Sequence, residues 1–178
     1  DQIVFLCLDN GRLNNFLVTL IRKSFWPTTK YVTNILLISG APPPNPLQPI
    51  FKHIIVSIIK LISNRFPKLS IYAGHDPYRQ SFKAEYEYSK QKIQAGAKGL
   101  FTQPIFNEHL SNMLFQLDLN CQWYIGISPV LSENSYNYWV SRNNVIFQSD
   151  FELTIDYNVR IGKKIIQISK DANQNNYI

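Results

Sequence analysis

The chain has 178 residues, of which 45% are hydrophobic and 17% charged, and its formal net charge is +6. This length is sufficient for one domain with a sizeable core, and the composition excludes an intrinsically disordered chain. No apolar run approaches the ~18 residues that a membrane span needs, and the basic residues are scattered rather than clustered. We therefore expect no membrane or nucleic-acid partner, and an anionic small ligand accounts better for the positive charge.

The two cysteines, Cys7 and Cys121, lie in apolar runs with strand character, and no CxxC or Cys/His cluster is present. We therefore expect a reduced protein of the cytoplasm without a structural disulfide. The first residues, Asp1-Gln2-Ile3, include neither an initiator Met nor the basic flank of a signal peptide, so we expect the sequence to be the interior of a longer chain.

About six short apolar runs predict buried parallel strands, and helical periodicity fills the intervals between them. The predicted strands are, in chain order, Ile3–Leu8, Asn34–Ile38, Leu69–Ala73, Gly99–Thr102, Gln122–Ile127 and Asn176–Ile178. The predicted helices are Leu13–Ser24, Phe51–Asn64, Ser81–Gln94, Asn107–Leu117, Asn134–Arg142 and a long helix from a capping box at Ser149–Glu152 to about Lys170.

Two of these helices show which side they bury. The first has one apolar stripe, formed by Phe51, Ile54, Ile55, Ile58 and Ile62. In the second, we expect the apolar face to consist of Phe82, Tyr86 and Ile93. Ser89 and Lys92 of this second helix match the S-x-x-K spacing of some nucleophilic enzymes, but their position in mid-helix favours a solvated face instead.

Alternation of strand and helix at intervals of roughly 25–35 residues predicts βα units on a parallel sheet. A doubly wound open sheet and a (β/α)8 TIM barrel both satisfy this pattern. No GxGxxG or Walker-type glycine loop follows a strand, which counts against a Rossmann site, and the varied polar loops favour the barrel. On the barrel interpretation, residues 1–178 are a single partial domain with about six of the eight strands, and the first two precede Asp1. We expect this piece alone to self-associate through its open strand edges.

The candidate ligand-binding residues follow the predicted strands. Four polar segments lie there: Ser39–Pro42, Gly74–Gln80, Thr102–Pro104 and Ser128–Val130. Ordinary βα turns explain each segment taken singly, but in a barrel all four would open onto one rim, where ligands bind. The three histidines, His53, His75 and His109, do not share ligand spacing, so we expect no metal site.

Three stretches of the sequence resemble one enzyme family. They are NILLISGAPPP (34–44), AGHDPYRQSFKAEYEYSKQKIQAGAKGLFTQPIF (73–106) and GISPV (126–130). In this order they resemble the methylenetetrahydrofolate reductases, most of all a bacterial branch with DPYRQSFK and SPVLSE motifs. The resemblance implies a (β/α)8 barrel that holds FAD at the carboxyl ends of its strands. It also implies that NAD(P)H supplies the hydride that reduces 5,10-methylenetetrahydrofolate to 5-methyltetrahydrofolate, in one-carbon and methionine metabolism.

The resemblance assigns site residues position by position. Gln103 matches the glutamine that contacts the folate pteridine, and an amide both donates to and accepts from a pterin edge. Gly40, between Ser39 and Ala41, matches a glycine that lies against the flavin. The other FAD-contacting positions are Glu85, Tyr88 and Lys92 on a helix and Ala73, Gly74, His75 and Asp76 in a turn. Glu85 and Lys92 match contacts to the adenosine and diphosphate part.

Departures from the family pattern keep an alternative open. Ala41 replaces an aspartate near the flavin and the folate, so we expect a flavin that is easier to reduce and a slower folate half-reaction. Tyr88 and Gln91 replace an amide and a basic residue. The glutamate that acts as the family's general acid would precede Asp1, so we expect no catalytic residue in this chain. The alternative is a non-catalytic homologue that binds flavin or folate; in either case the partner is a small molecule, with a homo-oligomer as a further option.

Overall fold

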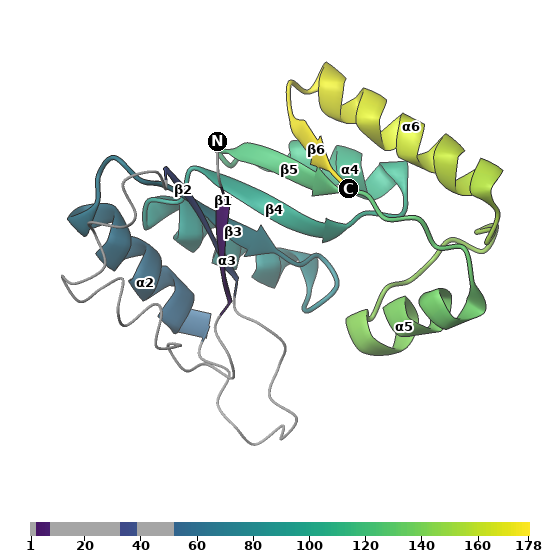
Figure 1. Cartoon of the computed structure of the whole chain (residues 1–178), viewed down its shortest axis with the longest axis horizontal. Helices are drawn as coiled ribbons and strands as arrows, with labels where there is room; N and C mark the ends of the chain where they lie inside the picture. Colours follow the sequence, from purple (N-terminus) through teal and green to yellow (C-terminus); the bar gives the residue numbers. More distant parts are fainter. Residues whose placement is uncertain (1–2, 8–32, 39–51) are drawn as a thin grey trace. The chain divides into compact units, whose positions relative to one another are not determined.

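The computed structural model describes residues 3–7, 33–38 and 52–178. The predicted helix Leu13–Ser24 and the three residues Ser39, Gly40 and Ala41 lie outside the described residues. The described elements are, in chain order, β1 (Ile3–Cys7), β2 (Asn34–Ile38), α2 (Lys52–Arg65), β3 (Ser70–His75), α3 (Phe82–Gln94), β4 (Gly99–Pro104), α4 (Glu108–Phe115), β5 (Gln122–Gly126), α5 (Glu133–Asn143), α6 (Ile155–Asp171) and β6 (Asn175–Tyr177) (Figure 1).

Parallel strands alternate with helices, as the sequence predicts. The order of the strands in the sheet is the chain order, β1-β2-β3-β4-β5-β6. In β1 and β2, Ile3 lies opposite Asn34, and β2 and β3 place Asn34 opposite Ser70. In β5 and β6, Gly126 lies opposite Tyr177. Helices α2 to α5 agree with their predicted bounds to within two residues.

The chain forms two compact units. The first comprises residues 1–74 and 90–99, and the second comprises residues 75–89 and 100–178. In the first unit, the predicted stripe of α2 is buried at Ile55, Ile58 and Ile62, and Ile59 completes it. Helix α2 contacts β2, and Ile35 and Leu37 of β2 and Ile71 of β3 are buried in the same unit.

A Schellman motif ends α3 within the first unit. The backbone N–H of Gly96 donates to the carbonyl of Ile93, and that of Ala97 donates to the carbonyl of Lys92. Gly96 has a φ of +116°, and a Cβ there would lie 2.4 Å from Ser63 Oγ. Both the backbone conformation and the close approach therefore require a glycine at this position.

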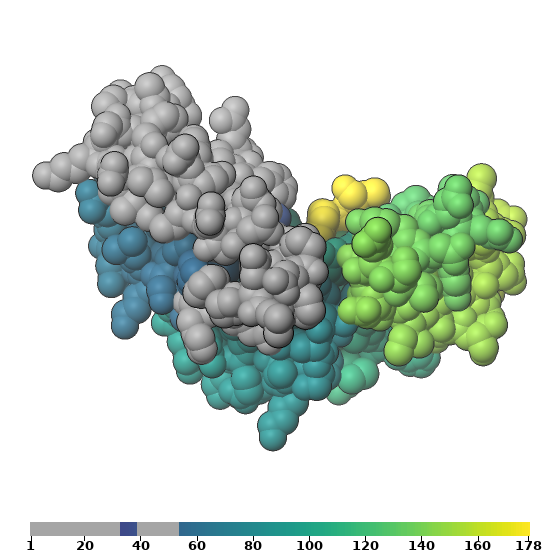
Figure 2. All heavy atoms as spheres, turned by 90° about the horizontal axis from the view of Figure 1, so that it is seen from below, coloured from purple at the N-terminus to yellow at the C-terminus, as the bar shows by residue number. Residues whose placement is uncertain are grey.

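The second unit has two groups of buried apolar side chains. Leu100, Trp123, Ile125 and Ile165 are buried along β4, β5 and α6. A second cluster is built on Phe106, Val130 and Val145, and the half-buried side chains around it are Tyr78, Tyr136, Trp139, Phe147, Phe151 and Leu153. Figure 2 shows the surface that α5 and the chain after it, drawn in green, form in this unit; Tyr138 and Ile146 are among its exposed side chains.

The predicted start of the last helix is wrong. The capping box at Ser149–Glu152 does not open α6, which begins at Ile155 with Thr154 as its N-cap. The Thr154 hydroxyl accepts a hydrogen bond from the backbone N–H of Tyr157 at 3.3 Å. Residues 151–153 are not helical because Phe151 and Leu153 pack against the cluster of Phe106, Val130 and Val145. Tertiary burial of these two side chains outweighs the local capping signal.

Two strands extend further than their apolar runs predict. β3 continues to His75 instead of ending at Ala73, and β4 continues to Pro104 instead of ending at Thr102. The predicted turn at 73–76 is therefore wrong for its first three residues, which belong to β3, and Gln103 lies inside β4. The ladder persists because backbone pairing does not need apolar side chains; just beyond β4, the N–H of Ile105 still donates to the Gly126 carbonyl at 2.8 Å.

Candidate functional site

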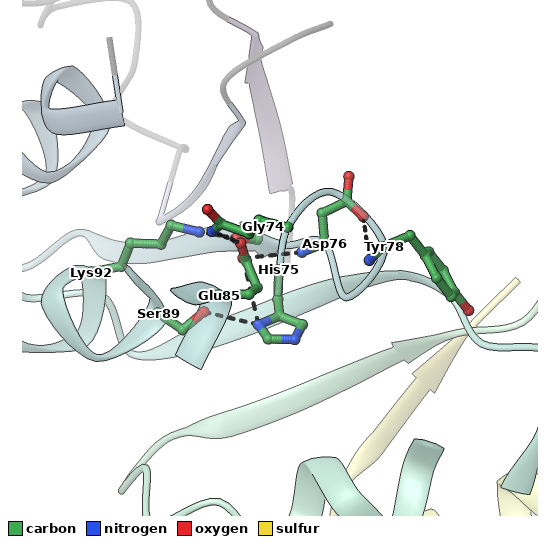
Figure 3. A network of polar contacts seen from close by, with 8 residues as sticks. Gly74, His75, Asp76, Tyr78, Glu85, Ser89 and Lys92 are labelled. Carbon is green, nitrogen blue, oxygen red and sulfur yellow. Dashed lines mark hydrogen bonds and ion pairs between the residues drawn. The ribbon is translucent and has the colours of Figure 1, made fainter. Parts of the chain in front are cut away.

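Helix α3 buries a polar side. Glu85, Ser89 and Lys92 are 2%, 0% and 4% exposed, and their spacing places them on one side of the helix (Figure 3). The prediction that Ser89 and Lys92 belong to a solvated face is therefore wrong. The side chains expected to form the buried face, Phe82, Tyr86 and Ile93, are only half-buried. Hydrophobic periodicity could not reveal this face because the residues that form it are polar.

His75 connects the end of β3 to this buried side of α3. Its Nδ1 shares a hydrogen bond of 2.8 Å with Ser89 Oγ and lies 3.7 Å from Glu85 Oε1. The imidazole is 2% exposed, and its ring meets the Trp123 ring edge-on at 5.1 Å between centroids. The sequence places His75 in a flavin-contacting turn, whereas the structure places it in a strand with its side chain against α3 (Figure 3).

Glu85 holds the loop between β3 and α3. Its Oε1 accepts a hydrogen bond of 3.2 Å from the backbone N–H of Asp76, and its Oε2 accepts one of 2.6 Å from Gln80 Nε2. Asp76, which is half-buried, in turn accepts a hydrogen bond of 3.1 Å from the backbone N–H of Tyr78 through Oδ1. This Asx turn and the Glu85 carboxylate together fix the path of residues 76–80.

The ammonium group of Lys92 is buried within the first unit. Its Nζ donates a hydrogen bond of 2.6 Å to the Gly74 carbonyl (Figure 3). Gly74 belongs to β3, where a Cβ would lie 3.3 Å from Ile38 Cγ2, and its neighbour Ala73 is fully buried. Lys92, Gly74 and Ala73 therefore present no exposed polar side chain to a ligand.

The residues expected to hold the adenosine diphosphate part of FAD make hydrogen bonds within the protein. Glu85 and Lys92 direct their charged groups to partners within the protein, as described above. Tyr88 is half-buried. Burial, and to a smaller extent the negative charge of Glu85, raises the pKa of its hydroxyl to about 12, whereas the positive charge of Arg79 lowers this pKa. Gln91 is exposed and carries no charge for a phosphate. The expected flavin-contacting residues Ser39, Gly40 and Ala41 lie outside the described residues.

The end of β4 carries several polar contacts within the second unit. The Thr102 hydroxyl accepts a hydrogen bond of 3.0 Å from the backbone N–H of Gly126. The Thr102 carbonyl accepts one from the Tyr177 hydroxyl, and the Pro104 carbonyl accepts one of 2.9 Å from the Tyr78 hydroxyl. Gln103 lies between these two carbonyls and is half-buried. The sequence predicts Gln103 as a site residue, but it does not single out the two tyrosines.

An aromatic group occupies the face of the sheet to which Gln103 belongs. Along β4, Leu100 and Thr102 are buried while Phe101 and Gln103 are half-buried, as strand alternation requires. Phe101 stacks on Tyr124 with 4.2 Å between ring centroids and an interplanar angle of 1°. The Tyr177 ring lies 5.4 Å from that of Phe101. Gln103 thus belongs to the same face of β4 as Phe101, two residues further along the strand.

Comparisons with known proteins identify the fold. No family model matches this sequence, and neither does any curated protein. The chain is similar in structure to 2,3-dimethylmalate lyase, a member of the PEP mutase/isocitrate lyase superfamily. The TM-score is 0.53 at 12% identity, over 96% of this chain and 70% of that one. A putative mandelate racemase from Bordetella bronchiseptica RB50 matches with a TM-score of 0.53 at 10% identity, over 98% of this chain and 43% of that one.

Both structures belong to TIM-barrel superfamilies, so the predicted fold class is confirmed. The fold is α/β, and the described residues supply a six-stranded sheet that is consistent with an incomplete (β/α)8 barrel. The chain spans less than half of the racemase. At identities this low the likeness concerns the fold alone, because the chemistry of a barrel depends on the residues of its site.

The part of the chain that the structure describes offers neither a membrane-spanning helix nor a metal-binding cluster. No helix there is long and apolar enough to cross a bilayer. No group of three or more His, Cys, Asp or Glu side chains there could hold a metal ion. In the second unit, the candidate site consists of the carboxyl end of β4 and the tyrosines Tyr78 and Tyr177 that bond to its backbone.

Proposed function

We propose that the chain binds a reduced folate at the carboxyl end of β4, as part of an enzyme that reduces 5,10-methylenetetrahydrofolate to 5-methyltetrahydrofolate with NAD(P)H. The observation that carries the proposal is the placement of Gln103. It is half-buried at the penultimate position of a barrel strand. Ligand contacts of (β/α)8 barrels come from strand ends of this kind, and the sequence resemblance assigns Gln103 to the pteridine.

Gln103 has the chemistry that pterin recognition needs. Its side-chain carbonyl accepts and its amide nitrogen donates, so one residue can pair with adjacent acceptor and donor atoms on a pterin edge. The neighbouring rings of Phe101 and Tyr124 provide an apolar setting in which such hydrogen bonds gain strength. The net reaction transfers one hydride from NAD(P)H and one proton to the folate, and yields NAD(P)+ and the methyl product. In the family that the sequence resembles, FAD serves this transfer.

A second candidate, a folate-binding homologue without turnover, is favoured by a specific observation. Glu85 and Lys92, the helix residues assigned to FAD, are buried on protein partners. Ala41 also stands where the family has an aspartate. Both candidates place folate at Gln103 and differ in whether the protein holds a flavin.

The absorbance spectrum of the purified full-length protein separates the two candidates. The reductase is expected to show a flavin spectrum that bleaches on anaerobic addition of NADH or NADPH and returns on addition of methylenetetrahydrofolate. A colourless protein that takes up no added FAD but binds folate would establish the second candidate.

The folate site itself is tested by Gln103→Leu. We expect this variant to weaken binding of 5-methyltetrahydrofolate about tenfold or more, because the pterin loses a paired donor and acceptor. Gln94→Leu, at an exposed position at the end of α3, is the matched control and should leave the dissociation constant unchanged. Equal affinity of the Gln103 variant and the wild type, measured by titration calorimetry, would contradict the proposed site.

A further inference from the structure

We infer that Tyr78 and Tyr177 are positioning residues for Gln103. Their hydroxyls donate to the backbone carbonyls of Pro104 and Thr102, the residues on either side of Gln103. This inference rests on the proposed folate site but not on the presence of a flavin. It assigns a role to two side chains that the sequence motifs leave unassigned.

Tyr177 reaches β4 across β5. It lies on β6 opposite Gly126 of β5, and its hydroxyl bonds to the Thr102 carbonyl. The ring has room to cross because Gly126 has no side chain; a Cβ there would lie 2.8 Å from the Tyr177 hydroxyl oxygen. The N–H of Gly126 also donates to the Thr102 hydroxyl, so Thr102 is held at both its side chain and its carbonyl.

Tyr78 reaches β4 from the loop after β3. Its backbone N–H is fixed by Asp76 Oδ1, and its ring packs against the cluster of Phe106, Val130 and Val145. Its hydroxyl bonds to the Pro104 carbonyl at 2.9 Å. Burial raises the pKa of both Tyr78 and Tyr177, so both phenols stay protonated and remain donors at neutral pH.

These contacts restrict the backbone of Gln103 more than pairing of β4 alone would. A residue before proline is already limited to extended conformations, and Pro104 has no N–H of its own to donate. Hydrogen bonds to the carbonyls of Thr102 and Pro104 limit the remaining rotation of this backbone segment. The direction of its Cα–Cβ bond is then set before a ligand binds, which lowers the entropic cost of ordering this part of the site on binding.

The experiment compares Tyr78→Phe and Tyr177→Phe with Tyr138→Phe in the full-length protein. Tyr138, 55% exposed on α5, is the matched control for loss of a phenol hydroxyl. The first readout is the side-chain amide resonance of Gln103 in protein labelled with 15N-glutamine, assigned by its loss in Gln103→Leu. The second is the dissociation constant of 5-methyltetrahydrofolate, measured in wild-type and Gln103→Leu backgrounds.

We expect both site variants to shift the Gln103 resonance and increase its mobility, and to weaken folate binding about 3- to 10-fold. Because the tyrosines act through Gln103, this loss should disappear in the Gln103→Leu background. An unchanged resonance overturns the inference, and so does a loss of affinity that persists without Gln103. A changed resonance in a protein that binds no folate supports the inference and refutes the proposed function.

Discussion

Gly126 leaves room for the Tyr177 ring because it has no side chain. A Cβ on Gly126 would lie 2.8 Å from the Tyr177 hydroxyl oxygen and 3.2 Å from Cα of Pro104. We predict that Gly126→Ala displaces the Tyr177 ring, breaks its hydrogen bond to the Thr102 carbonyl and destabilises the protein by ~1–3 kcal/mol. Denaturant unfolding measures the loss of stability. Folate affinity should fall as it does in Tyr177→Phe.

Gly162→Ala is the control for this change. A Cβ at Gly162, in the middle of α6, would meet Ile127 Cγ2 at 3.6 Å, which is an ordinary contact. Alanine is the better helix former, so we expect this variant to be as stable as the wild type or more stable by up to ~1 kcal/mol. Equal destabilisation by the two alanines would show that crowding at Tyr177 is not the cause.

The contacts of Glu85 require two acceptor oxygens, which a carboxylate has and the amide of glutamine lacks. Both its oxygens accept, from the Asp76 N–H and from Gln80 Nε2, and Glu85→Gln would place an NH2 against one of these donors. A buried donor facing another donor costs ~1–3 kcal/mol, so the variant should unfold at lower denaturant concentration. Glu87→Gln, on the exposed side of α3, should change stability by less than ~0.5 kcal/mol. A similar midpoint for both variants would contradict the assigned contacts.

The sequence predicts the order of strands and helices because apolar periodicity follows burial, and α2 shows this at Ile55, Ile58 and Ile62. The same signal fails on α3, whose buried residues Glu85, Ser89 and Lys92 are polar. Their partners come from β3 and its loop, many positions away in the chain, so no local pattern reveals them.

The candidate site shows the same limit. Gln103 can be selected from the sequence because a polar amide ends an apolar run. The roles of Tyr78, which lies in the predicted segment Gly74–Gln80, and of Tyr177 cannot be predicted in this way, because each acts through a hydroxyl that reaches the backbone of a different element. The strand ends are also underestimated, since the backbone ladder continues through polar residues that have no apolar alternation.

Cys121 provides a pH-dependent test of burial in the second unit. Burial raises the pKa of its thiol from 9.0 to about 11. About one thiol in a thousand is therefore ionised at pH 8, and alkylation by iodoacetamide, which needs the thiolate, should be slow. The rate should rise about tenfold per pH unit up to about pH 11, as followed by mass spectrometry of the peptide that contains Cys121.

The raised pKa of Cys121 makes the free energy of unfolding decrease as the pH rises. Between pH 9 and 11 the folded chain keeps the Cys121 proton while the unfolded chain releases it, so the folded state binds more protons. Unfolding is therefore favoured as pH rises through this interval. Cys121→Ser should reduce that part of the pH dependence. An alkylation rate that levels off near pH 9 would contradict the raised pKa.

The N-cap of α6 can be assigned by two single substitutions. The Thr154 hydroxyl accepts from the Tyr157 N–H, whereas Ser149 is exposed and lies outside the helix. We predict that Thr154→Ala destabilises the protein by ~1 kcal/mol, because a backbone donor in the first turn loses its partner. Ser149→Ala should stay within ~0.5 kcal/mol of the wild type. The reverse ranking in thermal unfolding would restore the capping box at Ser149–Glu152 and extend α6 toward Phe151, at the expense of its packing against Phe106, Val130 and Val145.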